Sequence, residues 1–165
     1  MKKYSFLILL AFALLLAKPA FALQCKAGNG GMESDECWTE VKISIVETNP
    51  VIRGTVLYYE NSTDSSEENG FEARVSSTPS NDRVRVAGVA QRSFATGDTA
   101  RILVRGSGAL RVTQTVATGD LLYVGGSDAG TAGRNAAASR DQAIAFARQA
   151  STTQRATIDA YIVVI

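Results

Sequence analysis

The sequence predicts an all-β protein, folded as a single small β-barrel or β-sandwich with a disulfide-closed N-terminal segment. Three observations support this fold class. Apolar and polar residues alternate with a period of two, short β-rich runs recur roughly every ten residues, and 14 glycines with only three prolines separate these runs. Many short strands joined by glycine turns are typical of barrels and sandwiches.

Residues 1–22 are predicted to be a signal peptide. Lys2 and Lys3 precede an apolar run from Phe6 to Ala17, and Ala20-Phe21-Ala22 matches the small-x-small pattern of a cleavage site. The run is shorter than the roughly 20 residues that span a bilayer. We therefore expect a secreted protein, extracellular or at the cell surface with the periplasm as an alternative, and no stable membrane insertion.

Residues 23–50 are predicted to form an N-terminal segment that precedes a barrel domain over 51–165. Cys25 and Cys37 are the two cysteines of the chain. In an oxidising compartment they are expected to form a disulfide that contributes about 3 kcal/mol by loop closure. A metal site is disfavoured because the chain has no histidine and no second cysteine pair.

The first half of the chain shows four β-rich runs. Residues 23–40 are expected to be irregular, after which Val41, Ile43 and Ile45 place an apolar set on one face of a strand. Further strands are predicted at 56–59, 71–75 and 83–89. The polar loop 61–70 offers oxygen ligands, and the sequence leaves open whether it binds calcium.

A four-residue motif occurs twice in the second half, at 95–98 and 117–120, with the sequence Ala-Thr-Gly-Asp. A β run and a glycine-rich turn follow each copy: 100–105 precedes 106–108, and 121–124 precedes 125–126. Glycine accepts positive φ and aspartate caps its own backbone, so both copies are expected to be tight turns in β-arches of one barrel.

The last two predicted strands are 142–149 and 156–165, joined by a turn at 151–154. The first is alanine-rich, which leaves a short helix open as an alternative. The strand is favoured because Ile144 and Phe146, two residues apart, would then share a face. In the final strand Ile158, Ile162 and Val164 alternate with polar residues.

From Gly88-Val89-Ala90 onward the sequence resembles the β-barrel domains of phage capsid decoration and capsid-fibre head proteins, which also occur in secreted bacterial surface proteins. The resemblance rests on the two Gly-Asp turns, the segment Gly119-Asp120-Leu121-Leu122 and the apolar C-terminal strand, and it covers roughly residues 54–165. It implies a non-enzymatic, homo-oligomeric structural module with no active site. The predicted signal peptide departs from this family, because capsid decorators assemble in the cytoplasm.

The composition excludes several kinds of chemistry. Without histidine, a serine or cysteine nucleophile has no imidazole base. Asp98, Asp120, Asp128 and Asp159 are the carboxylates considered for paired acid–base catalysis, but a capping role explains the first two. No enzyme activity and no cofactor are predicted. The near balance of 17 basic and 16 acidic residues gives no reason to expect nucleic-acid binding.

Five arginines fall at alternating positions of predicted strands: Arg83, Arg85, Arg101, Arg105 and Arg111. They are interpreted as charges that guard strand edges against aggregation, with a polyanion-binding stripe as the alternative.

The leading hypothesis is a secreted structural subunit that self-associates into a filament, surface layer or decoration assembly. Its assembly strands would carry Val41, Ile43 and Ile45 near one end, and Ile158, Ile162 and Val164 near the other, unless both strands close the molecule's own barrel. The competing hypothesis is a monomeric module that binds glycans or another surface polymer. Its aromatic platform would consist of Trp38, Tyr58, Tyr59 and Tyr123. A virion decoration protein is the third hypothesis.

Overall fold

A computed structural model describes residues 23–26, 36–45, 47–59, 72–75, 86–124, 128–135 and 139–164. The predicted all-β class is confirmed: ten strands form one mostly antiparallel sheet, accompanied by a single turn of 3₁₀ helix at Arg140–Gln142 in the described ranges. The strands are β1 (Gln24–Lys26), β2 (Glu36–Ile43), β3 (Val56–Tyr59), β4 (Glu72–Val75), β5 (Val86–Ala90), β6 (Thr99–Arg111), β7 (Leu121–Val124), β8 (Ala132–Gly133), β9 (Ala145–Ala147) and β10 (Thr157–Val163).

Five strands close into a ring, which we call the first ring. Its order is β2-β4-β3-β5-β6, and the pairing of β2 with β6 from Cys37↔Arg105 to Lys42↔Thr99 completes the circle. The side chains inside this ring are almost all small or β-branched, so they fill a narrow interior. Its core consists of Val41, Ile43, Val51, Leu57, Val75, Ala87, Ala90, Ala100 and Ile102.

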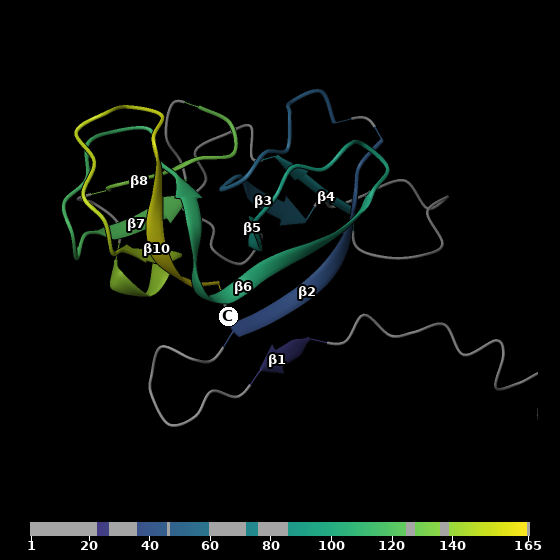
Figure 1. Cartoon of the computed structure of the whole chain (residues 1–165), viewed down its shortest axis with the longest axis horizontal. Helices are drawn as coiled ribbons and strands as arrows, with labels where there is room; N and C mark the ends of the chain where they lie inside the picture. The colour runs from purple at the N-terminus through teal and green to yellow at the C-terminus, as the bar shows by residue number, and fades with distance from the viewer. Residues whose placement is uncertain are drawn as a thin grey trace, which may run out of the picture.

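A second ring uses the other half of β6. β10 pairs with β6 from Thr157↔Arg111 to Val163↔Arg105, and the sheet continues through β9 and β7 to β8. A parallel bridge between Val112 and Ala132 brings β8 back to the end of β6. Figure 1 shows β3, β4 and β5 on one side of β6, and β7, β8 and β10 on the other.

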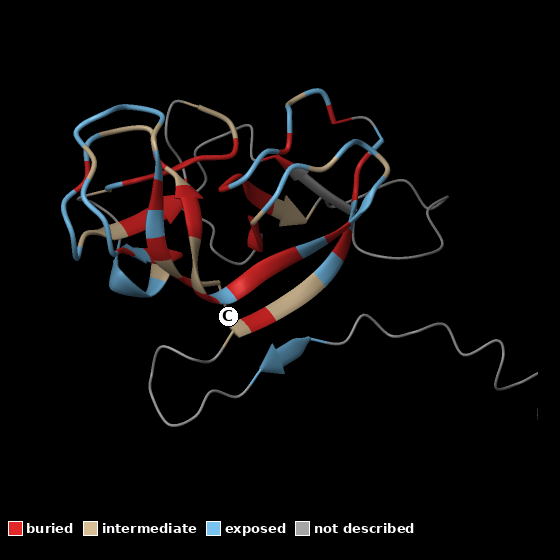
Figure 2. Cartoon of the chain, viewed as in Figure 1, coloured by how far each residue is buried: buried red, intermediate tan, exposed pale blue. Residues whose placement is uncertain are grey.

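The core of the second ring is a second cluster, which extends onto β3 and β5 of the first ring and includes Leu110, Leu122, Ile144, Ile158 and Ile162, all at most 2% exposed. Figure 2 shows buried stretches in both halves of β6, separated by an exposed position at Arg105, whereas β1 is exposed. The predicted alternation of the last strand is confirmed, because its even-numbered residues from 158 to 162 are buried.

The glycine turn predicted at 106–108 does not form. β6 continues through these residues, at the place where it leaves its partner in the first ring and pairs with β10 in the second. A Cβ on Gly108 would lie 2.6 Å from a Leu103 methyl group and 2.8 Å from the Gln91 amide oxygen. The Gln91 side chain accepts from the Ala109 N–H at 2.8 Å and donates to its carbonyl at 3.1 Å. Gly108 therefore marks a place where two side chains pack closely against the strand, and not a chain reversal.

The N-terminal segment is more regular than predicted. Residues 36–40 were expected to be irregular, yet they form the first half of β2, and β1 pairs with them from Gln24↔Trp38 to Lys26↔Glu36. The disulfide is present between Cys25 and Cys37, which face each other in this register with Cα atoms 4.0 Å apart. The disulfide therefore joins β1 to β2, a strand pairing that was not predicted from the sequence.

Two predictions of shared strand faces were wrong. β2 ends at Ile43, so Ile45 lies in the following turn and is 66% exposed, while Val41 and Ile43 are buried. The strand predicted at 142–149 is confirmed only for 145–147, after the 3₁₀ turn. Ile144 precedes β9 and is fully buried, whereas Phe146 within β9 is 43% exposed.

Candidate functional site

The strands considered for assembly are already paired within the chain. β2 contacts β6 along one edge and β1 and β4 along the other, and β10 lies between β6 and β9. Val41, Ile43, Ile158 and Ile162 are buried, and Val164 is partly buried against the second-ring core. These five positions thus contribute to the molecule's own sheet and core, whereas the sixth, Ile45, lies in the turn after β2 and is exposed.

The four aromatic residues considered as a ligand platform lie on three different strands. Tyr58 and Tyr59 are on β3, where Tyr59 packs against the first-ring core and burial raises the pKa of its hydroxyl. Tyr123 on β7 is only 5% exposed. Trp38 on β2 packs against the second-ring core, so these rings do not form one exposed row.

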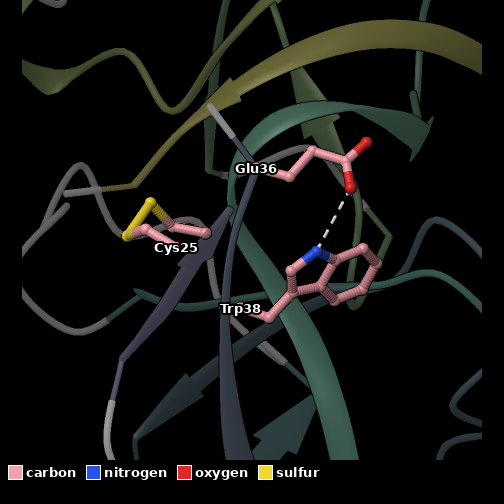
Figure 3. The surroundings of a disulfide bond; sticks show 4 residues. Cys25, Glu36 and Trp38 are labelled. Carbon is pink, nitrogen blue, oxygen red and sulfur yellow. Dashed lines mark hydrogen bonds between the residues drawn. A yellow bond between two sulfur atoms is a disulfide. The ribbon is translucent and has the colours of Figure 1, made fainter. Parts of the chain in front are cut away.

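Trp38 makes a side-chain contact at its indole N–H and another at one ring face. Its indole N–H donates to Glu36 Oε2 at 3.4 Å, as Figure 3 shows, and the Arg101 guanidinium lies 5.1 Å from its ring centroid. This cation–π contact covers a face of the indole that a ligand platform would need open. Arg101 and Arg105 are exposed, Arg111 is partly exposed, and Arg83 and Arg85 lie outside the described residues, as does the loop 61–70.

The four candidate catalytic carboxylates lie at different elements. Asp98 and Asp120 cap their turns, each accepting a backbone N–H three residues earlier at 2.8 Å. Asp128 accepts a two-point contact from the Arg155 guanidinium at 2.6 and 3.0 Å, and this partner raises the pKa of Arg155. Asp159, on β10, lines a surface groove.

The outer face of the second ring presents a row of side chains that crosses four strands. The register places Leu121 of β7 opposite Phe146 of β9, Phe146 opposite Tyr161 of β10, and Tyr161 opposite Ser107 of β6. Phe146 is 43% exposed and Leu121, Tyr161 and Ser107 are partly exposed. We call this outer surface, together with the groove beside it, the β9–β10 face.

The groove in the β9–β10 face has a volume of about 450 Å³. Its floor is formed by small residues of β6 and β10, namely Gly108, Ala109 and Ala160. Polar side chains form its walls: Arg53, Ser107, Arg148, Gln149 and Asp159. The lining therefore combines small residues of the sheet with polar and charged side chains.

Hydrogen bonds position two of these wall residues. Arg148 Nη1 donates to the Ser107 hydroxyl at 2.7 Å, which fixes the guanidinium across β10. Gln149 Oε1 accepts the Asp159 backbone N–H at 3.2 Å. The backbone N–H groups of Arg148 and Gln149 both donate to the Asp159 carbonyl, so the end of β9 is tied to β10. These hydrogen bonds therefore hold Arg148 and Gln149 against β6 and β10.

A second hollow lies at the opposite end of the row. It has a volume of about 490 Å³ and is lined by Gln114, Leu121, Tyr123, Arg134 and Asn135. Arg134 Nε lies 3.7 Å from Asp120 Oδ2, which connects this hollow to the second Gly-Asp turn. The row from Leu121 to Ser107 thus has a hollow at each end.

The β9–β10 face was not predicted from the sequence, although the sequence contains a signal for it. In Ala145-Phe146-Ala147, the two alanines are buried and the phenylalanine is exposed. Successive side chains of a strand point to opposite faces, so the two small alanines share the face opposite to Phe146. That pattern would have placed Phe146 outside. The contribution of Arg53, from a distant turn, carries no such local signal.

Within the described ranges, no three Cys, Asp or Glu side chains are arranged to hold a metal ion. The helical content of these ranges includes no segment long and apolar enough to cross a bilayer.

Comparison with known proteins identifies the fold. The structure is similar to the crystal structure of the head fiber gp8.5 N base in bacteriophage phi29, with a TM-score of 0.50 and 14% sequence identity. The alignment covers 78% of this chain and 95% of that chain. The chain therefore has a capsid-fibre-like all-β fold. No family model matches the sequence. No curated protein matches it either.

Proposed function

We propose that this chain is a non-enzymatic structural subunit that is exported and self-associates into an extracellular filament, surface layer or decoration assembly. The single observation that carries the proposal is the fold, which is shared with a bacteriophage head fiber base over 95% of that chain. Attachment to a virion surface is the related alternative within the same structural class.

The use of the carboxylates supports a structural role. Asp98 and Asp120 cap turns, and Asp128 binds Arg155. Glu47 is buried, with Oε1 accepting from the Asn49 N–H at 2.7 Å and Oε2 accepting from the Val75 N–H at 2.8 Å. A carboxylate that accepts backbone hydrogen bonds stabilises the fold, and these four residues are engaged in that way or with a cation.

Sedimentation velocity and negative-stain microscopy on the full chain, produced through an oxidising secretion route, test self-association. The expected result is discrete assemblies whose population grows with protein concentration. A monomer over a wide concentration range would refute self-association. Phe146→Ala and Ile45→Ala each shorten one exposed apolar side chain, in different parts of the fold. The variant that assembles less readily identifies the surface that makes the contact between subunits.

Mass spectrometry of the secreted material tests export separately. The predicted cleavage yields a chain that begins at Leu23, with Cys25 joined to Cys37. Recovery of the whole chain inside the cell, with residues 1–22 still attached, would contradict the export part of the proposal without affecting self-association.

A further inference from the structure

The groove in the β9–β10 face combines hydrogen-bond donors and acceptors on a small scale. Arg53 and Arg148 present guanidinium donors, Asp159 presents a carboxylate acceptor, and the Gln149 amide can do both. Vicinal hydroxyl groups of a sugar also donate and accept at once, so they can satisfy this mixed lining. A volume of about 450 Å³ lies within the usual range of small-ligand sites.

The charge of the groove favours an acidic ligand. Two guanidinium groups and one carboxylate line it, which leaves a positive charge in excess. A guanidinium binds a carboxylate through two parallel hydrogen bonds, a geometry that lysine does not offer. The Arg148 side chain is positioned by Ser107, so little conformational entropy is lost when it binds a ligand.

Two aromatic side chains lie beside the groove on the same outer surface. Phe146 of β9 is paired with Tyr161 of β10. The next pair along these strands is Ala147 with Ala160, and Ala160 lines the groove. Phe146 is 43% exposed, and the electron-rich face of an aromatic ring attracts the polarised C–H groups of a sugar ring. Polar wall and apolar platform thus lie side by side on one surface.

We propose that the β9–β10 face is a binding site for an acidic carbohydrate, a glycan that contains uronic acid residues. The sugar carboxylate binds Arg53 and Arg148, its hydroxyl groups bind Gln149 and Asp159, and a neighbouring sugar ring stacks on Phe146. This inference goes beyond the structural role proposed above, because it assigns the surface a ligand and does not depend on self-association.

The first test is a titration of the ¹⁵N-labelled chain with tri-galacturonic acid, monitored by NMR, with the neutral trisaccharide maltotriose as the matched control. We expect tri-galacturonic acid to bind with a Kd on the order of 1 mM, as is typical of a small open site. The largest shifts are expected at Ser107, Phe146, Arg148 and Asp159. Maltotriose is expected to bind at least about fivefold more weakly.

Substitutions then test the assigned roles. Arg53→Gln is expected to weaken binding about tenfold through loss of a charge-assisted contact, and Phe146→Ala about fivefold through loss of stacking. Arg140→Gln and Ile45→Ala are the matched controls, because both side chains are exposed and do not line the groove. They are expected to leave the Kd unchanged.

Three results would overturn the proposal. They are shifts that map away from the β9–β10 face, equal affinity for maltotriose, and no shifts at a concentration about tenfold above the expected Kd. The mapping is performed on the unaltered chain, so misfolding of a variant cannot obscure it. Binding by a monomeric chain would support this site while refuting self-association, and assembly without binding would do the reverse.

Discussion

The two Gly-Asp turns have the same backbone and different surroundings. In both, glycine has positive φ, +81° at Gly97 and +90° at Gly119, and the aspartate accepts the N–H of the alanine three residues earlier. Both glycine N–H groups donate to the end of a neighbouring strand, at the Ile43 carbonyl in the first ring and the Ala147 carbonyl in the second.

The strand partners continue the correspondence. Before the first turn Phe94 bridges to Val51, and before the second Val116 bridges to Ser151. After the turns, β6 pairs antiparallel with β2 and β7 pairs antiparallel with β9. The short sequence repeat is therefore the visible part of a repeated three-dimensional corner, in which two antiparallel chain segments turn together.

The corners differ in how their partner segments are fastened. In the first ring, the segment after β2 carries Glu47, whose buried carboxylate bonds to the Val75 N–H, 28 residues away. In the second ring, the segment after β9 carries Gln149, which bonds to Asp159 on an exposed surface. The segment beside the turn is thus held by a buried carboxylate in the first ring and by an exposed amide side chain in the second.

The largest difference is expected when these anchors are removed. Glu47→Ala leaves the N–H groups of Asn49 and Val75 without their carboxylate acceptor, and we expect a loss of about 3 kcal/mol in the free energy of unfolding. Gln149→Ala removes one exposed bond and is expected to cost about 0.5 kcal/mol. Urea denaturation followed by circular dichroism measures both.

Glu40→Ala is the control for loss of a carboxylate, because Glu40 is exposed on β2. It is expected to change the free energy of unfolding by less than about 0.5 kcal/mol. Equal effects of Glu47→Ala and Gln149→Ala would show that the two corners are fastened alike, contrary to the comparison.

A smaller effect is expected from the turn caps. Asp98→Ala and Asp120→Ala each remove one side-chain hydrogen bond to a backbone N–H at 2.8 Å, which is worth about 1 kcal/mol. Because the caps are alike and lie in different rings, the two losses should be similar, and additive in the double variant. Thermal and urea unfolding of the three variants measure this; a loss confined to one cap would contradict a shared role.

The turns were predictable because their chemistry is local. Glycine at positive φ followed by a capping aspartate needs no information from the rest of the chain, and the same holds for the period of two in β10. The position of Gly108 was not predictable in this way. Its requirement is tertiary, set by Leu103 and Gln91 packing against the strand, and a local reading takes the same residue for a turn.

The candidate site was less accessible to sequence reasoning than the fold. Aromatic residues were selected by type, and three of the four lie on β2 or β3, away from the exposed row. The groove brings Arg53 together with Arg148 and Asp159, both of which lie about a hundred residues after Arg53 in the chain. Only strand order and register bring them together, and composition contains neither.

The smallest expected effect concerns the ion pair that distinguishes the second turn. Arg134 Nε lies 3.7 Å from Asp120 Oδ2, and the two side chains are 53% and 25% exposed. Exposed pairs of this kind contribute little after screening by solvent and salt, so Arg134→Gln is expected to lower the free energy of unfolding by less than about 0.5 kcal/mol. Denaturation at low and high salt measures it, with Arg140→Gln as the control. One turn cap contributes about 1 kcal/mol. A loss above about 1 kcal/mol for Arg134→Gln that disappears at high salt would therefore contradict this expectation, and would show that the charge pair stabilises the second corner at least as much as the cap does.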